Sequence, residues 1–115
     1  MRRPETERVG PWSNAQLDTC IARATVDAYD EFEQRVGLFT AIEGSLGLPF
    51  ETQVLGVDVI VEAIDQTQTG DIAAICRHGR SRQRIPILDL RLPSPLPTGT
   101  KWIEAYRRWC GARRG

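Results

Sequence analysis

The spacing of apolar residues changes once along the chain, at Leu48-Pro49-Phe50, and this change constrains the fold more than any other feature. Before it, apolar residues recur at helical intervals. After it, β-branched residues alternate with their neighbours over residues 50–64, as in strands. The proline disfavours helix at the residue before it and marks the entry into extended chain. The sequence therefore predicts helices first and short strands afterwards.

Two helices are predicted in the first part. A serine–glutamine capping pattern precedes an apolar stripe, which predicts a first helix from about Asn14 to Arg35. Gly37 is expected to interrupt the helical region, and a second, shorter helix should end by residue 47. Tyr29 is expected to pack among the helices. The stripe consists of Leu17, Ile21, Ala24, Ala28 and Phe32.

Four or five short strands joined by tight turns are predicted over residues 50–90, and a small SH3-like barrel needs this many. A proline-rich tether over residues 91–98 leads to an aromatic C-terminal helix over residues 99–110, which Gly111 should end. The predicted class is α+β: N-terminal helices, a small SH3-like β-barrel and a C-terminal helix. The chain of 115 residues suits one domain, over residues 13–115, after a flexible arm over residues 1–12.

Composition narrows the classes of function. No apolar run approaches the roughly 20 residues of a membrane span, and the polar start lacks the apolar core of a signal peptide, so a cytoplasmic monomer is expected. The three cysteines are widely spaced and odd in number, which favours reduced thiols over disulfides. No catalytic triad order, phosphate loop or metalloprotease motif is present, so the chain is not expected to be an enzyme.

Net charge is zero, but the charges are divided along the chain. Residues 11–75 hold eleven acidic and two basic residues, and residues 76–115 hold ten basic and two acidic ones. Such asymmetry raises the question of a charged partner for each half. A fold can equally bring the two halves together, and the sequence alone leaves both possibilities open.

A cluster of four carboxylates is the strongest candidate for a metal site. Three of them would be neighbours on an ideal helix, where like charges repel unless the face is solvated or a cation binds there. Calcium takes 6–8 oxygen ligands in irregular geometry, which such a face can supply in part. The clustered acids are Asp27, Asp30, Glu31 and Glu33, and the acids that could complete the shell are Asp58, Glu62, Asp65 and Asp89.

Several short segments also carry a resemblance to a known family. They are Val26-Asp27-Ala28-Tyr29-Asp30-Glu31-Phe32-Glu33-Gln34, Gly37, Leu48-Pro49-Phe50, Leu55-Gly56, Ala74-Ile75-Cys76-Arg77 and Leu88-Asp89-Leu90. These segments resemble small prokaryotic, cyanobacterial-type calcium-binding proteins that lack an EF-hand. The resemblance covers roughly residues 20–93. It implies helices followed by a small barrel, with calcium bound by the acids of the matching helix for buffering or signalling.

The basic C-terminal half supports an alternative function. An SH3-like module could bind a protein or a nucleic acid through a basic and aromatic patch, with Trp102, Arg107 and Arg108 as the candidate contacts. The simpler interpretation is an amphipathic helix whose aromatic rings pack on the predicted barrel while its arginines face water. A calcium ion and a protein partner are the expected partners, with nucleic acid less favoured.

Overall fold

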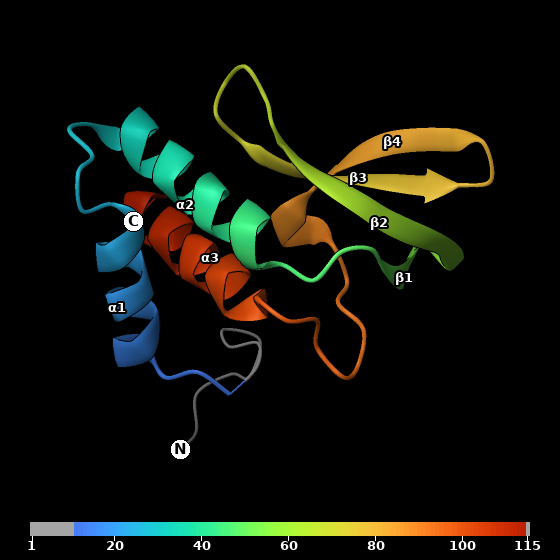
Figure 1. The fold of residues 1–115 in the computed structure, drawn as a ribbon, viewed down its shortest axis with the longest axis horizontal. Helices are drawn as coiled ribbons and strands as arrows, with labels where there is room; N and C mark the ends of the chain where they lie inside the picture. The colour runs from blue at the N-terminus through green and yellow to red at the C-terminus, as the bar shows by residue number, and fades with distance from the viewer. Residues whose placement is uncertain (1–10, 115) are drawn as a thin grey trace.

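The computed structural model describes residues 11–114, and this part of the chain holds three α-helices and a four-stranded sheet (Figure 1). The helices are α1 (Asn14–Ala24), α2 (Glu31–Ser45) and α3 (Thr100–Arg114). The strands are β1 (Phe50–Val54), β2 (Val57–Gln66), β3 (Ile72–His78) and β4 (Ser81–Pro86). A single 3-10 turn, η2 (Ile87–Asp89), follows β4. Figure 1 shows the helices on one side of the molecule and the strands on the other.

The sheet is an antiparallel meander in the order β1-β2-β3-β4. The predicted strands, their turns and the α+β class are confirmed. The sheet is open in the described residues, with β1 and β4 as its edges, so the predicted closed barrel is not observed. Pro86 ends β4, in keeping with the confinement of proline to edges and strand ends.

The core lies where the inner face of the sheet meets α2 and α3. Alternate strand residues point toward the helices, so β2 contributes Val59 and Val61, and β3 contributes Ala74 and Cys76. The helical side of the same cluster consists of Leu38, Ile42, Leu46, Ile103, Tyr106 and Trp109. In residues 11–114 no helix is both long enough and apolar enough to cross a membrane.

The predicted single helix from Asn14 to Arg35 is wrong, because the chain turns between Ala24 and Glu31. Asp30 is the N-cap of α2: its Oδ1 accepts a hydrogen bond from the backbone N–H of Glu33 at 2.8 Å. The Glu33 carboxylate in turn accepts one from the backbone N–H of Tyr29 at 2.6 Å. These bonds satisfy donors that a helix start leaves unpaired, and so they fix a new helix at this point.

Gly37 does not interrupt the helical region as predicted but lies within α2. A Cβ added there would sit 2.0 Å from the backbone oxygen of Ala24. The absence of a side chain therefore lets the C-terminal end of α1 lie directly against α2. The glycine permits a close helix crossing rather than a break.

The C-terminal helix also differs from its predicted range, because α3 continues past Gly111 to Arg114. Its last turn is held against α2. Arg113 donates to the side chain of Gln34 at 2.9 Å, and its guanidinium lies 4.8 Å from the centre of the Trp109 ring. The predicted N-terminal arm lies outside the described residues except for Pro11 and Trp12.

Candidate functional site at the α1–α2 corner

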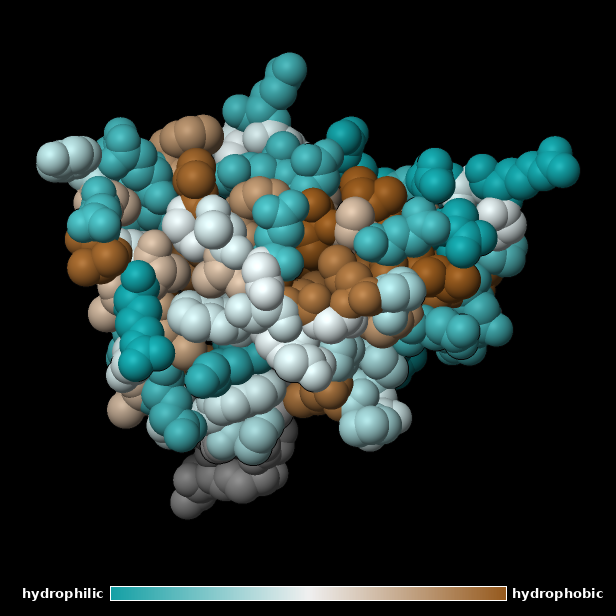
Figure 2. All heavy atoms as spheres, in the orientation of Figure 1, coloured by the Kyte–Doolittle hydropathy of each residue, from teal (hydrophilic) through white to brown (hydrophobic). Residues whose placement is uncertain are grey.

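The turn between α1 and α2, with the first turns of α2, exposes an unusual amount of apolar surface. This α1–α2 corner, residues 25–36, carries Val26 at 76%, Tyr29 at 94% and Phe32 at 53% exposure. Val36 lies one helical turn beyond Phe32 on the same face. Figure 2 shows brown and tan side chains among teal ones over the helical side of the molecule. Grouped exposed apolar residues are typical of interaction sites.

The predicted carboxylate cluster lies at this same corner, but most of its members have structural partners. Asp30 and Glu33 bind backbone N–H groups at the start of α2, and Glu31 lies 3.3 Å from the guanidinium of Arg113. Anions at a helix N-terminus interact favourably with its macrodipole. Asp27 lies in the turn and makes no ion pair or hydrogen bond through its side chain within the described residues.

No group of three or more His, Cys, Asp or Glu side chains in residues 11–114 is arranged to hold a metal ion. The four clustered acids are neighbours in sequence at one corner, yet they do not converge as ligands. The four additional candidates lie on other elements. Asp58, Glu62 and Asp65 are on β2, and Asp89 is in η2.

The outer face of the sheet carries paired charges. Glu62 accepts hydrogen bonds from Arg77 and Arg82, and Asp65 accepts two from Arg84 at 2.6 and 3.1 Å. These guanidinium groups hold the pKa of both carboxyls below the usual range. The arginines of the β3–β4 hairpin therefore neutralise Glu62 and Asp65, whereas Asp58 accepts a hydrogen bond from the Gln53 side chain at 2.9 Å.

The candidate partner-binding residues of α3 are also engaged within the chain. Arg108 donates to the Asp18 carboxylate of α1 at 2.6 Å, which lowers the pKa of Asp18. Arg107 donates to Glu104 at 3.0 Å and to the backbone oxygen of Leu88 at 3.2 Å. Trp102 is half-buried against the core. The division of charge along the sequence thus becomes a set of internal ion pairs.

Against this pattern, part of the negative charge at the α1–α2 corner has no counterion among the described residues, although Glu31 pairs with Arg113. Asp27, Asp30 and Glu33 have no Lys, Arg or His partner within residues 11–114. The sequence places acids here and predicts Tyr29 and Phe32 to be packed. Tyr29 is instead 94% exposed, whereas Phe32 is 53% exposed with its ring lying against Gly70. The site is therefore an apolar surface bordered by uncompensated carboxylates.

One buried carboxylate elsewhere has an unusual environment. Glu104 is 3% exposed, and its Oε2 has no hydrogen-bond partner among the described residues. Burial raises the pKa of Glu104, and the neighbouring Arg107 opposes that shift only in part. The folded state therefore favours the protonated form of this side chain more than the unfolded state does.

Glu104→Gln removes the buried negative charge and is consequently expected to increase the free energy of unfolding at pH 8 by on the order of 1 kcal/mol, because burial disfavours the ionised carboxylate. An acid whose folded pKa is raised loses stability as pH rises through that pKa, so the advantage of the variant should shrink toward pH 5. Urea denaturation of both proteins at the two pH values measures this. A variant less stable at both values would mean that the Arg107 ion pair outweighs the burial cost.

Comparison of the chain with protein-family models, curated proteins and solved structures found no match in any of the three. The resemblance to prokaryotic calcium-binding proteins therefore stays a prediction from the sequence.

Proposed function

We propose that the protein is a binding module whose α1–α2 corner docks a basic, amphipathic segment of a partner protein. The observation that carries the proposal is the exposure of Tyr29 and Val26 beside carboxylates that have no cationic partner in the described residues. Apolar side chains of the segment would cover the exposed residues, and its lysines or arginines would meet Asp27 and Glu33. Complementary charge of this kind raises association rates and rejects acidic competitors.

The expected affinity is modest. Complete burial of a large apolar side chain contributes about 1.5–3 kcal/mol, and a few such side chains must also offset the entropy of association. The acids that border the patch are exposed, so their contribution should fall as salt screens them. We therefore expect reversible, salt-sensitive binding with a dissociation constant in the micromolar range or weaker. The magnitude of the corresponding binding free energy is on the order of 8 kcal/mol or less.

Calorimetry with a helical peptide of leucine and lysine tests the proposal. Tyr29→Ser should weaken binding by about tenfold, equivalent to ~1.4 kcal/mol, because the loss of one central aromatic anchor typically costs at least this much. Asp27→Asn should weaken it less, and mainly at low salt. The side chains of both residues are exposed and form no hydrogen bond or ion pair in the described part of the chain, so the fold should be unaffected.

Matched controls are available elsewhere on the surface. Leu55 is 97% exposed at the β1–β2 turn, so Leu55→Ser removes a comparable apolar group far from the corner in sequence. Glu43 is an exposed acid later in α2, so Glu43→Gln removes a comparable charge. Equal weakening by the control and corner variants would mean that the peptide binds nonspecifically, and the proposal would be wrong.

Calcium binding by Asp27, Asp30, Glu31 and Glu33 is a second candidate, favoured because three of these acids, all but Glu31, have no cationic partner among the described residues. It requires the corner to rearrange, because no three ligand side chains converge within residues 11–114. Calorimetric titration of chelator-treated protein with calcium, with magnesium as the control, tests it. Saturable heat lost in the Asp27→Asn/Asp30→Asn variant would support calcium, and its absence up to millimolar calcium would leave the docking proposal alone.

We also propose that the open sheet is an SH3-like arrangement short of closure. A β-barrel closes when the last segment reaches the first strand. Here the chain after η2 returns to β1, where the Thr52 hydroxyl donates to the backbone oxygen of Arg91. This contact supports the likeness, and a fifth strand at this position would complete it.

A further inference from the structure

The edge of the sheet formed by β4 has no neighbouring strand in the described residues. β4 pairs with β3 alone, and Figure 1 shows it at the outer margin of the sheet, away from the helices. The opposite edge differs, because the chain returns to β1 at Arg91. Unpaired backbone groups along an edge form a template on which another extended chain can add.

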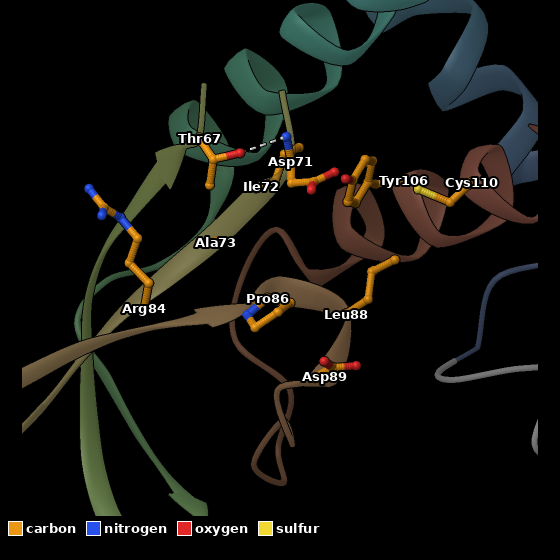
Figure 3. A pocket seen from close by; sticks show the side chains of 10 residues that line it. All are labelled: Thr67, Asp71, Ile72, Ala73, Arg84, Pro86, Leu88, Asp89, Tyr106 and Cys110. Atoms are coloured by element: carbon orange, nitrogen blue, oxygen red, sulfur yellow. Dashed lines mark hydrogen bonds between the residues drawn. The ribbon is translucent and has the colours of Figure 1, made fainter. Parts of the chain in front are cut away.

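The register of the β3–β4 hairpin shows which backbone groups face outward. The closing pair of such a tight hairpin is hydrogen-bonded, so every second residue from Ser81 onward bonds to β3. The backbone groups of Arg82 and Arg84 therefore point away from β3, and they bond to no other backbone group within residues 11–114. Pro86 ends the row without a donor, and Figure 3 shows it where β4 ends.

The outer face of this edge carries more basic than acidic groups. Arg77 and Arg82, which lie opposite each other, share the single carboxylate of Glu62. Arg84 pairs with Asp65, and Figure 3 shows its side chain directed away from α3. The β3–β4 hairpin contains no acidic residue of its own. An extended segment added to β4 would therefore meet surplus positive charge on this face.

The inner face beside β4 offers an apolar hollow instead. The hollow has a volume of about 260 Å³ and lies between the start of β4 and the β1–β2 turn. Leu55 and Val57 at this turn are 97% and 42% exposed, so the described residues leave apolar surface uncovered here. Successive side chains of a strand point to opposite faces, so every second residue of an added strand would lie on the side of the hollow.

We propose that β4 docks an extended segment of a partner protein in which acidic and apolar residues alternate. The backbone of the segment would bond to the outward N–H and C=O groups of Arg82 and Arg84. Its carboxylates would lie beside these arginines, and its apolar side chains would face the hollow beside Leu55. A second copy of β4 suits the edge less well, because it would bring the arginines of two strands together, and like charges on facing strands destabilise their pairing.

Titration of isotopically labelled protein with a capped hexapeptide of alternating glutamate and valine tests the proposal. Saturable amide shifts are expected at residues 81–86. The amide protons of Arg82 and Arg84 should exchange rapidly in the free protein, and saturating peptide should slow their exchange about tenfold or more. Arg82→Gln should weaken binding about threefold, and less at high salt, while Arg77 still holds Glu62 in the variant.

The peptide backbone supplies a matched control. Methylation of the alternate peptide nitrogens that face β4 should weaken binding about tenfold, the effect of losing one or two hydrogen bonds. Methylation of the other alternate set, which faces solvent, should change the affinity little. A helical peptide of leucine and glutamate should give no shifts at β4, because its acidic and apolar residues do not alternate. Tyr29→Ser should leave the affinity unchanged, which separates this edge from the α1–α2 corner.

Three results would overturn the proposal. Equal affinity of the two methylated peptides would mean that the segment does not pair as a strand. Equal binding of a lysine–valine hexapeptide would mean that the arginines do not select acidic partners. Shifts at residues 81–86 that grow with protein concentration alone would assign the edge to a second copy of the chain.

Discussion

Trp109→Ala is expected to lower the free energy of unfolding by about 3–5 kcal/mol, the usual cost of deleting a buried tryptophan side chain. Trp109 is 2% exposed and stacks on Tyr106 with ring centres 6.2 Å apart. Its Nε1 donates to Gln34 at 2.8 Å, and the guanidiniums of Arg35 and Arg113 lie 5.2 and 4.8 Å from its ring. The substitution therefore removes packing, a hydrogen bond and two cation–π contacts. The bond to Gln34 and the contact with Arg35 join α2 to α3, and the contact with Arg113 lies within α3.

Equilibrium denaturation in guanidinium chloride measures this effect. Trp102→Ala is the matched control, because this second tryptophan of α3 is only half-buried and should cost clearly less. Trp109→Phe should fall between wild type and alanine, since it keeps a ring but not the donor. If Trp109→Ala and Trp102→Ala lowered the free energy of unfolding by similar amounts, Trp109 would not contribute more to the core than Trp102 does, and the prediction would be wrong.

Gly37→Ala is expected to destabilise the protein by about 3 kcal/mol, at the upper end of overpacking costs. The added Cβ would lie 2.0 Å from the Ala24 backbone oxygen, so α1 and α2 must separate. Gly44 is a matched control in the same helix, with no atom within 4 Å of an added Cβ. Gly44→Ala should instead stabilise the protein by roughly 0.5–1 kcal/mol, because alanine lowers the backbone entropy of the unfolded chain.

Thermal unfolding of both glycine variants gives the comparison directly. Gly37→Ala should lower the stability and Gly44→Ala should raise it. The difference is expected because only the Gly37 position contacts α1. If Gly37→Ala matched Gly44→Ala, the close helix crossing would not exist in solution. α1 would then be held mainly by α3, through contacts such as Asp18 with Arg108.

The strands were predictable because their signal is local. Alternation of β-branched residues over two positions, with glycines at the turns, located β1 to β4 without knowledge of the fold. Closure of the barrel was not predictable in the same way. It depends on whether residues near Arg91 pair fully with β1, which is a contact between distant segments.

The break between α1 and α2 shows where periodicity fails. The apolar stripe continues through Ala28 and Phe32, so it predicted one long helix. The spacing of Asp30 and Glu33 is also that of a helix cap, and in the structure this local signal prevails. The same acids that indicated a metal face are therefore partly explained as helix-starting residues.

The division of charge along the chain was visible in the sequence, but the ion pairs that these charges form were not. Pairs such as Asp18 with Arg108 are 90 positions apart, so only the fold shows that the two halves neutralise one another. What remains is the corner, where Tyr29 is exposed beside Asp27. Its exposure could not be predicted, because it follows from the helix break rather than from any property of tyrosine.

Amide chemical-shift mapping of the leucine–lysine peptide on isotopically labelled protein shows where on the molecule the peptide docks. Docking at the α1–α2 corner should concentrate the perturbations at residues 25–36, and Tyr29→Ser and added salt should reduce them. An otherwise identical leucine–glutamate peptide should produce none. Perturbations centred on the β3–β4 hairpin or α3 instead, or equal responses to both peptides, would contradict the proposed docking function.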